Sequence, residues 1–390
     1  MTFQQAPHKL LMIPGPIEVA DDVLYANAHP AMAHVAPQFV PVFGEVLTNL
    51  RKVVNASKDA QPLAIAGSGT MGWDMTALNV LQPGEEVLVL QTGYFSDGFA
   101  DALNAYGVKT TKVEAPVGKR PTIDEIKSAL KQKKYRAVTI THVDTSTGVL
   151  SDVKAIGEAV REVSPETLVL LDAVCSVASE QLRFDEWGVD VLLTASQKGL
   201  GCPPGMSLMV VSPRAIKAFE SRSAPPATYY LSWKHWIPVM KAYESGSPAY
   251  FGTPPTNLIY ALNQSLKTIL EGPVSLEQRL QKTKEASDKV KKFVNDLGLK
   301  QLVAEDLQQS NGAANGMTAV RFPPGMKAPD LLPKVAARGV VFGGGIHKEC
   351  KDEYFRIGHM GVSVVDSSRN DIDKLLSALK EALAEAGYKP

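Results

Sequence analysis

The sequence has no excess of charge of either sign. Lysine and arginine together number 41, aspartate and glutamate also number 41, and the formal net charge at pH 7 is +0. A protein that binds nucleic acid or an anionic membrane through surface charge usually carries clustered basic residues in surplus. The composition therefore disfavours nucleic acid and membrane partners and favours chemistry on small molecules.

Cysteine is scarce, and long apolar runs are absent. Cys175, Cys202 and Cys350 lie far apart and form no CxxC pair, so we expect neither a disulfide framework nor a metal site. No stretch reaches the ~18 consecutive apolar residues of a membrane span, and residues 1–16 lack the apolar core of a secretion signal. We expect a reducing compartment and a cytoplasmic location, with the peroxisome and the mitochondrion left open.

Short apolar runs of strand length recur along the chain and alternate with helical patterns. They are rich in Val, Ile and Leu, which is typical of strands buried on both faces. The alternation predicts an α/β fold whose mostly parallel sheet is covered by helices. The predicted strands of this sheet are residues 62–66, 87–90, 137–143, 167–174, 189–195 and 207–211.

Three parts of the chain differ in pattern. Residues 1–20 contain prolines and little periodicity, and we expect an extended N-terminal arm. Residues 21–262 hold the predicted sheet and are expected to form a large domain, in which a stretch rich in proline and aromatic residues, 224–256, makes an excursion over the surface or towards a partner. Residues 263–390 are expected to form a small α+β domain with two candidate strands and a closing helix.

One lysine directly follows a predicted strand. Lys198, in the stretch VDVLLTASQKGLGCPPG (189–205), is flanked by small residues and prolines instead of other charges. A solvated loop lysine is the alternative that general residue preferences favour. A lysine amine partly shielded from water can nevertheless be neutral enough to form a Schiff base with a carbonyl group.

A carboxylate ends the preceding predicted strand. Asp172 closes the run TLVLLD, and an ionised aspartate among apolar neighbours is best explained by a cation such as a protonated ring nitrogen, although it could also cap the next segment. Residues at the carboxyl ends of strands in an open α/β sheet converge on one crevice. Asp172 and Lys198 are therefore expected to face one planar ligand, and pyridoxal phosphate requires this pair of groups.

A glycine-rich turn follows the first predicted strand. GSGTMG (67–72) matches GxGxxG and makes an NAD-dependent dehydrogenase an alternative, but that fingerprint needs an acidic residue after the next strand, where Gln91 stands. A turn at a helix start remains, and its N–H groups suit a single phosphate, with hydroxyls from Ser68 and Thr70. A purely structural turn stays an alternative.

Together these motifs identify a resemblance. The sequence resembles the class V, fold-type I pyridoxal-phosphate aminotransferases, and within them the alanine–glyoxylate and serine–pyruvate aminotransferases. The similarity covers essentially the whole chain, and the lysine and aspartate motifs are specific, whereas the glycine motifs are individually weak. The matching motifs are IPGP, GSGT, THVDTSTG, LLDAVCS, SQKGLGCPPG, YFGTPPT and FRIGHMG.

The resemblance implies pyridoxal 5'-phosphate as cofactor and assigns roles to residues. Lys198 is implied to hold the cofactor covalently and Asp172 to pair with its ring nitrogen, which makes these two the catalytic residues. Arg356 is implied to bind the substrate carboxylate, and Tyr94 is the alternative to Phe95 as the ring stacked on the cofactor. The implied cofactor-binding residues are Ser68, Gly69, Thr70, Phe95, Thr145, Asp172, Gln197, Lys198, Tyr250 and Thr253.

The resemblance also implies a reaction and an assembly. The expected reaction is a ping-pong transfer of the amino group from a small amino acid, with alanine the first choice, to glyoxylate. Serine with pyruvate or glyoxylate stays open. SPAYFGTPPT (247–256) is expected to cross a homodimer interface, so that Tyr250 and Thr253 complete the site of the other subunit; an intramolecular loop is the alternative.

Other function classes are less well supported. A cysteine desulfurase would share the fold, but Cys350 stands between Glu349 and Lys351 without a loop of small residues. His347 and His359 lack a second cluster at metal spacing and are expected to be ordinary hydrogen-bonding residues. A non-catalytic binding protein would not need the complete set of lysine, aspartate and arginine.

Overall fold

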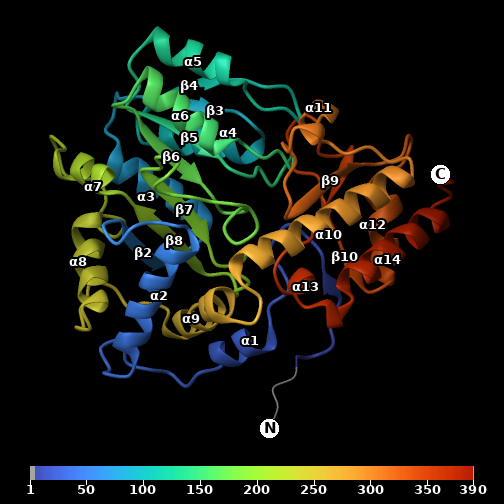
Figure 1. The fold of residues 1–390 in the computed structure, drawn as a ribbon, viewed down its shortest axis with the longest axis horizontal. Helices are drawn as coiled ribbons and strands as arrows, with labels where there is room; N and C mark the ends of the chain where they lie inside the picture. Colours follow the sequence, from blue (N-terminus) through green and yellow to red (C-terminus); the bar gives the residue numbers. More distant parts are fainter. Residues whose placement is uncertain (1–4, 390) are drawn as a thin grey trace.

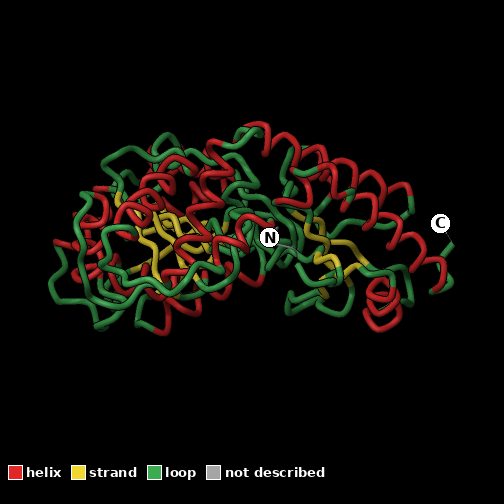
Figure 2. The backbone as a smooth tube through the Cα atoms, turned by 90° about the horizontal axis from the view of Figure 1, so that it is seen from below, coloured by secondary structure: helices red, strands yellow, loops and turns green. Residues whose placement is uncertain are grey.

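The computed structural model describes residues 5–389. Within this range the chain forms a large unit around one extended sheet and a smaller unit around two short sheets, as Figure 1 shows. In Figure 2 the strands of the large sheet lie between helices, and the smaller unit lies beside them. The N-terminal residues 5–20 contact both units before the first helix begins at Asp21.

The large sheet confirms the predicted α/β architecture. Its strand order is β2-β8-β7-β6-β5-β3-β4, and among the described residues only β8 runs opposite to its neighbours. Each predicted apolar run therefore forms a strand of this sheet. The strands are β2 (Gln61–Ala66), β3 (Glu86–Leu90), β4 (Lys109–Val113), β5 (Ala137–Thr141), β6 (Leu168–Asp172), β7 (Val191–Ala195) and β8 (Met206–Val211).

Strand β4 has no counterpart among the predicted strands. Its sequence, KTTKV, contains no apolar run, and its residues are exposed or half-buried. The strand pairs only with β3 and so forms an edge of the sheet. An edge strand does not need two apolar faces, and hydrophobicity alone therefore does not reveal it.

Helices cover both faces of the large sheet (Figures 1 and 2). The predicted helix from Val40 onward is present as α2, and its apolar face lies in the core. The helices of the large unit are α1 (Asp21–Asn27), α2 (Phe39–Val53), α3 (Gly69–Val80), α4 (Tyr94–Ala105), α5 (Ile123–Gln132), α6 (Val153–Val163), α7 (Pro213–Glu220), α8 (Trp233–Glu244) and α9 (Thr256–Glu271).

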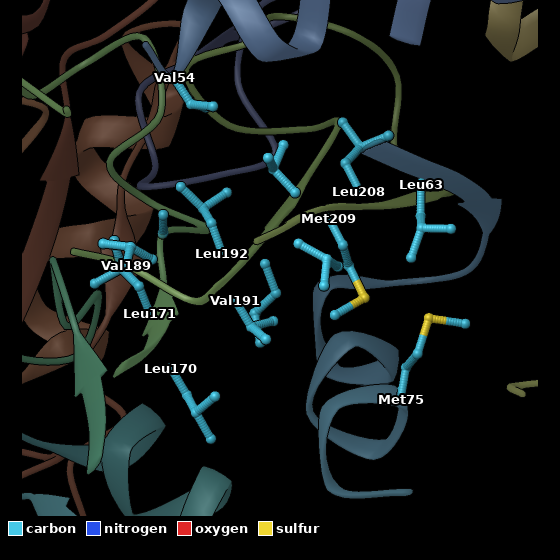
Figure 3. Close-up of a cluster of buried hydrophobic side chains, with 14 of the residues drawn as sticks. Val54, Leu63, Met75, Leu170, Leu171, Val189, Val191, Leu192, Leu208 and Met209 are labelled. Atoms are coloured by element: carbon cyan, nitrogen blue, oxygen red, sulfur yellow. The ribbon is translucent and has the colours of Figure 1, made fainter. Parts of the chain in front are cut away.

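A continuous hydrophobic core joins the sheet to these helices. Figure 3 shows side chains from neighbouring strands, among them Leu63, Val191 and Met209, gathered with Met75 of α3. Full burial of one such side chain contributes about 1.5–3 kcal/mol to folding. The core thereby fixes the strands relative to one another and positions the residues that follow their carboxyl ends.

The stretch 224–256 is only partly the surface excursion that its composition suggests. Residues 233–244 form α8, and Trp233 and Trp236 are buried in the main core. The excursion is therefore wrong for this helix, because the aromatic residues that interrupt the strand pattern are core residues. The segments on either side of α8 are exposed, with Tyr229 at 74% before the helix and Tyr250 at 64% after it.

The smaller unit is an α+β structure. Its antiparallel sheet has the order β11-β12-β9, and a second, two-stranded sheet pairs β1 with β10. The elements are β1 (Leu10–Leu11), β9 (Met317–Arg321), β10 (Val340–Val341), β11 (Gly343–Gly344), β12 (Tyr354–Gly358), α10 (Leu276–Asp296), α11 (Glu305–Gln309), α12 (Ala328–Ala337), α13 (Val362–Val365), a 3-10 turn (Ser367–Arg369) and α14 (Asp371–Glu385).

Two features of the structure bear on the expected domain limits. The division between residues 262 and 263 falls within α9, whose Leu262 and Leu266 lie in the same core. The arm expected at 1–20, whose first four residues lie outside the described range, contributes β1 to the smaller unit. The limits stay predictions. No helix among residues 5–389 has the length and apolar character needed to span a membrane.

The buried side chain of His142, in the loop after β5, makes the stability of the fold depend on pH. Its side chain is buried, its Nδ1 has no hydrogen-bond partner within residues 5–389, and burial lowers its pKa to about 3 from 6.5. The unfolded chain binds this proton below about pH 6.5 and the folded chain only near pH 3, so acidification through this window favours unfolding.

We predict that acidification from about pH 6.5 to pH 5 lowers the free energy of unfolding of His142→Phe less than that of the unmodified protein. The difference should approach about 1.4 kcal/mol per pH unit, because one proton fewer is taken up on unfolding. The new ring can keep the edge contact that His142 makes with Trp187. Urea unfolding at several pH values measures the two slopes, and identical slopes would contradict the prediction.

Candidate active site

A cavity of about 200 Å³ lies where several strands of the large sheet end. Its walls come from the turn between β2 and α3, the start of α4, the ends of β5 and β6, and the turn after β7. This is the crevice at which open α/β sheets bind ligands. The lining residues are Ser68, Gly69, Thr70, Trp73, Phe95, Thr141, Val143, Thr145, Asp172, Val174, Gln197 and Lys198.

Lys198 lies on the turn after β7. Its backbone carbonyl accepts a hydrogen bond from the N–H of Gly201 at 2.7 Å, and its Nζ donates to the carbonyl of Pro14 in the N-terminal arm. Burial lowers the pKa of the Lys198 amine, and the charge of Arg356 acts in the same direction. The amine can therefore lose its proton more easily than a surface lysine, which makes it a better nucleophile and base.

Asp172 is the last residue of β6 and faces the same cavity. Its Oδ2 accepts a hydrogen bond from Trp73 Nε1 at 2.8 Å, and its Oδ1 accepts one from the Val174 N–H at 3.0 Å. Burial raises the pKa of Asp172 to about 6, whereas these hydrogen bonds oppose the rise. The carboxylate forms no ion pair within the described residues, so it is suited to bind a cationic group of a ligand.

The turn between β2 and α3 presents hydrogen-bond donors to the cavity. Helix α3 begins at Gly69, and the side chain of Ser68 does not cap it. A Cβ on Gly69 would lie 2.8 Å from Val174 Cγ2, so glycine is needed for the helix to approach the segment after β6 this closely. The free N–H groups of the helix start, with the exposed hydroxyls of Ser68 and Thr70, suit a phosphate group.

Phe95, and not Tyr94, lines the cavity. The Phe95 ring packs against Trp73 with centroids 6.3 Å apart and planes at 62°. Tyr94 is 43% exposed and lies outside the lining. Of the two aromatic residues, Phe95 is thus the one placed to contact a flat ligand.

Arg356 approaches the cavity from β12 of the smaller unit. Its Nε donates to the Gly344 carbonyl at 2.7 Å, and its Nη1 donates to the carbonyl of the lining residue Thr145 at 3.2 Å. Nη2 makes no hydrogen bond within residues 5–389. Burial lowers the pKa of Arg356, but an arginine remains charged at neutral pH. The guanidinium therefore keeps N–H groups for a carboxylate at the border of the cavity.

Tyr250 and Thr253 are not brought to this cavity by their own chain. Tyr250 is 64% exposed, and its ring lies 5.0 Å from that of His34. Thr253 is also exposed. Neither residue belongs to the lining that contains Ser68.

Sequence reasoning did not identify the lining residues Trp73, Thr141, Val143 and Val174, or the Pro14 carbonyl that Lys198 contacts. Trp73 lies four residues after Gly69, hence on the same face of α3, and this spacing is a signal that the sequence does contain. The Pro14 carbonyl carries no local signal, because contacts between distant segments place the arm at Lys198, among them the pairing of β1 with β10 and a bond from the Ile17 N–H to the Gln197 carbonyl at 3.2 Å.

We predict that Trp73→Phe lowers kcat/KM roughly tenfold. The substitution removes one hydrogen bond to a charged group, which contributes about 1.5–3 kcal/mol, and keeps an aromatic ring beside Phe99. That bond favours ionised Asp172, so its loss raises the pKa of Asp172 and moves the acid limb of the pH profile to higher pH. Trp187→Phe, at an equally buried tryptophan outside the cavity, is the control. An unmoved acid limb would contradict this role.

Comparison with known proteins adds the family. The model for "Aminotransferase class-V" matches residues 20–356. The chain is 42% identical over 382 residues to alanine–glyoxylate aminotransferase 1 of Saccharomyces cerevisiae, with 96% of this chain and 97% of the relative covered. It is 32% identical to the L-aspartate–glyoxylate aminotransferase of Paracoccus denitrificans, with 90% and 86% covered.

A solved structure agrees with this assignment. The crystal structure of an alanine–glyoxylate aminotransferase from Nostoc sp. superimposes with a TM-score of 0.88 at 29% identity and covers 97% of this chain and 96% of that one. The glycine turn at 67–72 therefore belongs to an aminotransferase, and the dehydrogenase alternative is wrong. The chain is a member of the class-V aminotransferases, enzymes that depend on pyridoxal phosphate.

Proposed function

We propose that this enzyme transfers the amino group of alanine to glyoxylate and produces pyruvate and glycine. The observation that carries the proposal is the cavity that holds Lys198 and Asp172 together, with Arg356 at its border. The 42% identity to an alanine–glyoxylate aminotransferase over nearly the whole chain supports this choice of substrates.

The residues of the cavity fit pyridoxal phosphate. Asp172 is a buried carboxylate that forms no ion pair with any described residue, and Gln197 Oε1 is buried without a hydrogen-bond partner in the same part of the chain. We assign the ring nitrogen to Asp172, the aldehyde to Lys198, and the phosphate to the turn of Ser68 and Gly69. When bound, the cofactor draws electrons from the Cα–H bond and carries the amino group between substrates.

The chain's own groups then have distinct tasks. Burial lowers the pKa of Lys198, so its Nζ can act as a base. It takes the proton from the substrate Cα and later donates it to another atom of the bound reactants. The negatively charged Asp172 carboxylate stabilises the positive charge of the group bound at its end of the cavity. Arg356 orients the substrate by a planar, two-point grip on its carboxylate, which a lysine could not copy.

A steady-state panel tests the choice of substrates. Alanine, serine and aspartate are to be combined as donors with glyoxylate, pyruvate and 2-oxoglutarate as acceptors. We expect the highest kcat/KM for alanine with glyoxylate and parallel double-reciprocal lines, as a ping-pong cycle requires. Serine is the second candidate donor, since a serine–glyoxylate aminotransferase of Arabidopsis thaliana is 27% identical over 384 residues. A higher value for serine or aspartate would contradict the choice of alanine.

We propose further that two subunits share each active site. The exposed positions of Tyr250 and Thr253, outside the cavity of their own chain, support a role at the phosphate turn of a second subunit. The prolines of this loop restrict φ and favour an extended course, so the loop need not fold back onto its own sheet.

We predict that two inactive homodimers regain activity when their subunits are exchanged. Lys198→Ala lacks the amine, and the double variant Tyr250→Phe, Thr253→Ala should bind cofactor poorly. Each heterodimer would contain one complete site, so activity at limiting cofactor should rise well above both parents. If mass spectrometry shows exchange and activity stays at the parental level, both residues act within their own chain.

A further inference from the structure

A second cavity, of about 140 Å³, lies where the large unit, the arm and the smaller unit meet. The turn Gly199–Gly201, directly after Lys198, forms one wall, and Ser265 of α9 and Arg279 of α10 form others. It shares no lining residue with the active-site cavity. The Ser265 hydroxyl donates to the Leu200 carbonyl, which ties this wall to the turn that carries Lys198.

Arg279 is an unpaired cation on this cavity. It is 6% exposed, and its side chain makes no hydrogen bond or ion pair with any residue in the range 5–389. Burial lowers its pKa to about 10, so it remains charged at neutral pH. Buried charges in proteins are normally paired, because removing a charge from water without compensation is costly.

The carboxylates nearby are not the missing partner. Glu18 lines the cavity but accepts hydrogen bonds from Arg369 Nη2 and the Leu11 N–H, both at 2.9 Å. Asp366 is exposed and bonds within its own turn. These negative charges disfavour an anion with two or more charges beside Arg279, whereas a single negative charge would balance the free guanidinium.

We propose that this cavity binds a small monocarboxylate, with its carboxylate on Arg279. A guanidinium offers the planar pair of N–H groups that matches a carboxylate. The apolar side chains of Val23, Leu200 and Val365 form part of the lining and suit a short hydrocarbon portion. This site goes beyond the transamination reaction, and its occupancy would stabilise the turn that carries Lys198.

The test uses sodium acetate as probe and the unfolding temperature of the holoenzyme as readout. Acetate could also bind Arg356, so the measurements are made in the Arg356→Met background. There we expect a saturable rise of roughly 2 °C or more relative to sodium chloride at equal ionic strength. Adding Arg279→Met should abolish that rise, and Arg279→Lys should raise the half-saturating acetate concentration at least about tenfold.

Two controls make the outcome decisive. Arg338→Met removes an arginine that already has partners, Glu381 at 3.0 Å and Glu385 at 2.8 Å, and it should keep the acetate response. Without acetate, Arg279→Met should not lower the unfolding temperature, because no pairing is lost. The proposal is overturned if the acetate response survives Arg279→Met, if it is absent altogether, or if sulfate or phosphate produces a larger response than acetate. A loss of stability in Arg279→Met without acetate would also overturn it, because that loss would reveal a structural partner of Arg279.

Discussion

Replacement of Lys198 by alanine should lower kcat for transamination by at least about 10³-fold. The amine at this position is the group that can both hold the cofactor and move the Cα proton, and it is the only lysine amine that lines the cavity among the described residues. Added amines of small size should restore part of the rate, because they can replace the base but not its positioning.

Covalent mapping is the matching measurement for Lys198. Borohydride reduction of the holoenzyme followed by peptide mapping should place the cofactor on the peptide that contains Lys198. Lys291→Met is the matched control, because Lys291 is another half-buried lysine, burial lowers its pKa to about 8, and it lies outside the cavity. Cofactor found on any other lysine would refute the assignment.

Asp172→Asn should lower kcat by roughly 10²–10³-fold while the protein still binds the cofactor. An amide has nearly the same shape as the carboxylate but no charge, so it cannot stabilise a positive ring nitrogen. The amide can still accept one of the two hydrogen bonds that Asp172 receives from Trp73 and Val174. The effect should therefore fall on the rate more than on folding.

A cofactor analogue separates charge from structure at Asp172. Pyridoxal phosphate methylated at the ring nitrogen carries a permanent positive charge and does not need the carboxylate to keep it. It should restore Asp172→Asn towards the rate that the unmodified enzyme shows with the same analogue. A variant that keeps near wild-type kcat with the natural cofactor would remove Asp172 from the chemistry.

The parts of the fold that sequence predicts are those with a local physical cause. The strands that end near Asp172 and Lys198 are buried on both faces, so their apolar runs are visible without a structure. Edge strand β4 has a polar sequence and gives no such signal. In α8, Trp233 and Trp236 are buried by helices and strands distant in sequence, and no local rule identifies them as core residues.

The same division applies to the candidate site. Asp172, Lys198 and the glycine turn at Ser68 stand directly after strands, so the rule for open α/β sheets places them on one crevice. The Pro14 carbonyl reaches Lys198 through pairing of segments more than three hundred residues apart, β1 with β10, which sequence spacing cannot show. Trp73 is an intermediate case. The sequence shows its helical spacing from Gly69, but its hydrogen bond to Asp172 depends on where the fold places α3 relative to β6.

The half-reaction of the holoenzyme with alanine tests the proposed function most directly. With alanine labelled with ¹⁵N and no oxo acid present, the enzyme should release one pyruvate per cofactor-loaded subunit and then stop. Glyoxylate added after removal of free alanine should be converted to one equivalent of ¹⁵N-glycine, and Lys198→Ala should produce neither product at a comparable rate. Pyruvate formation that continues without an acceptor, or glycine that lacks the label, would contradict amino transfer from alanine to glyoxylate at this site.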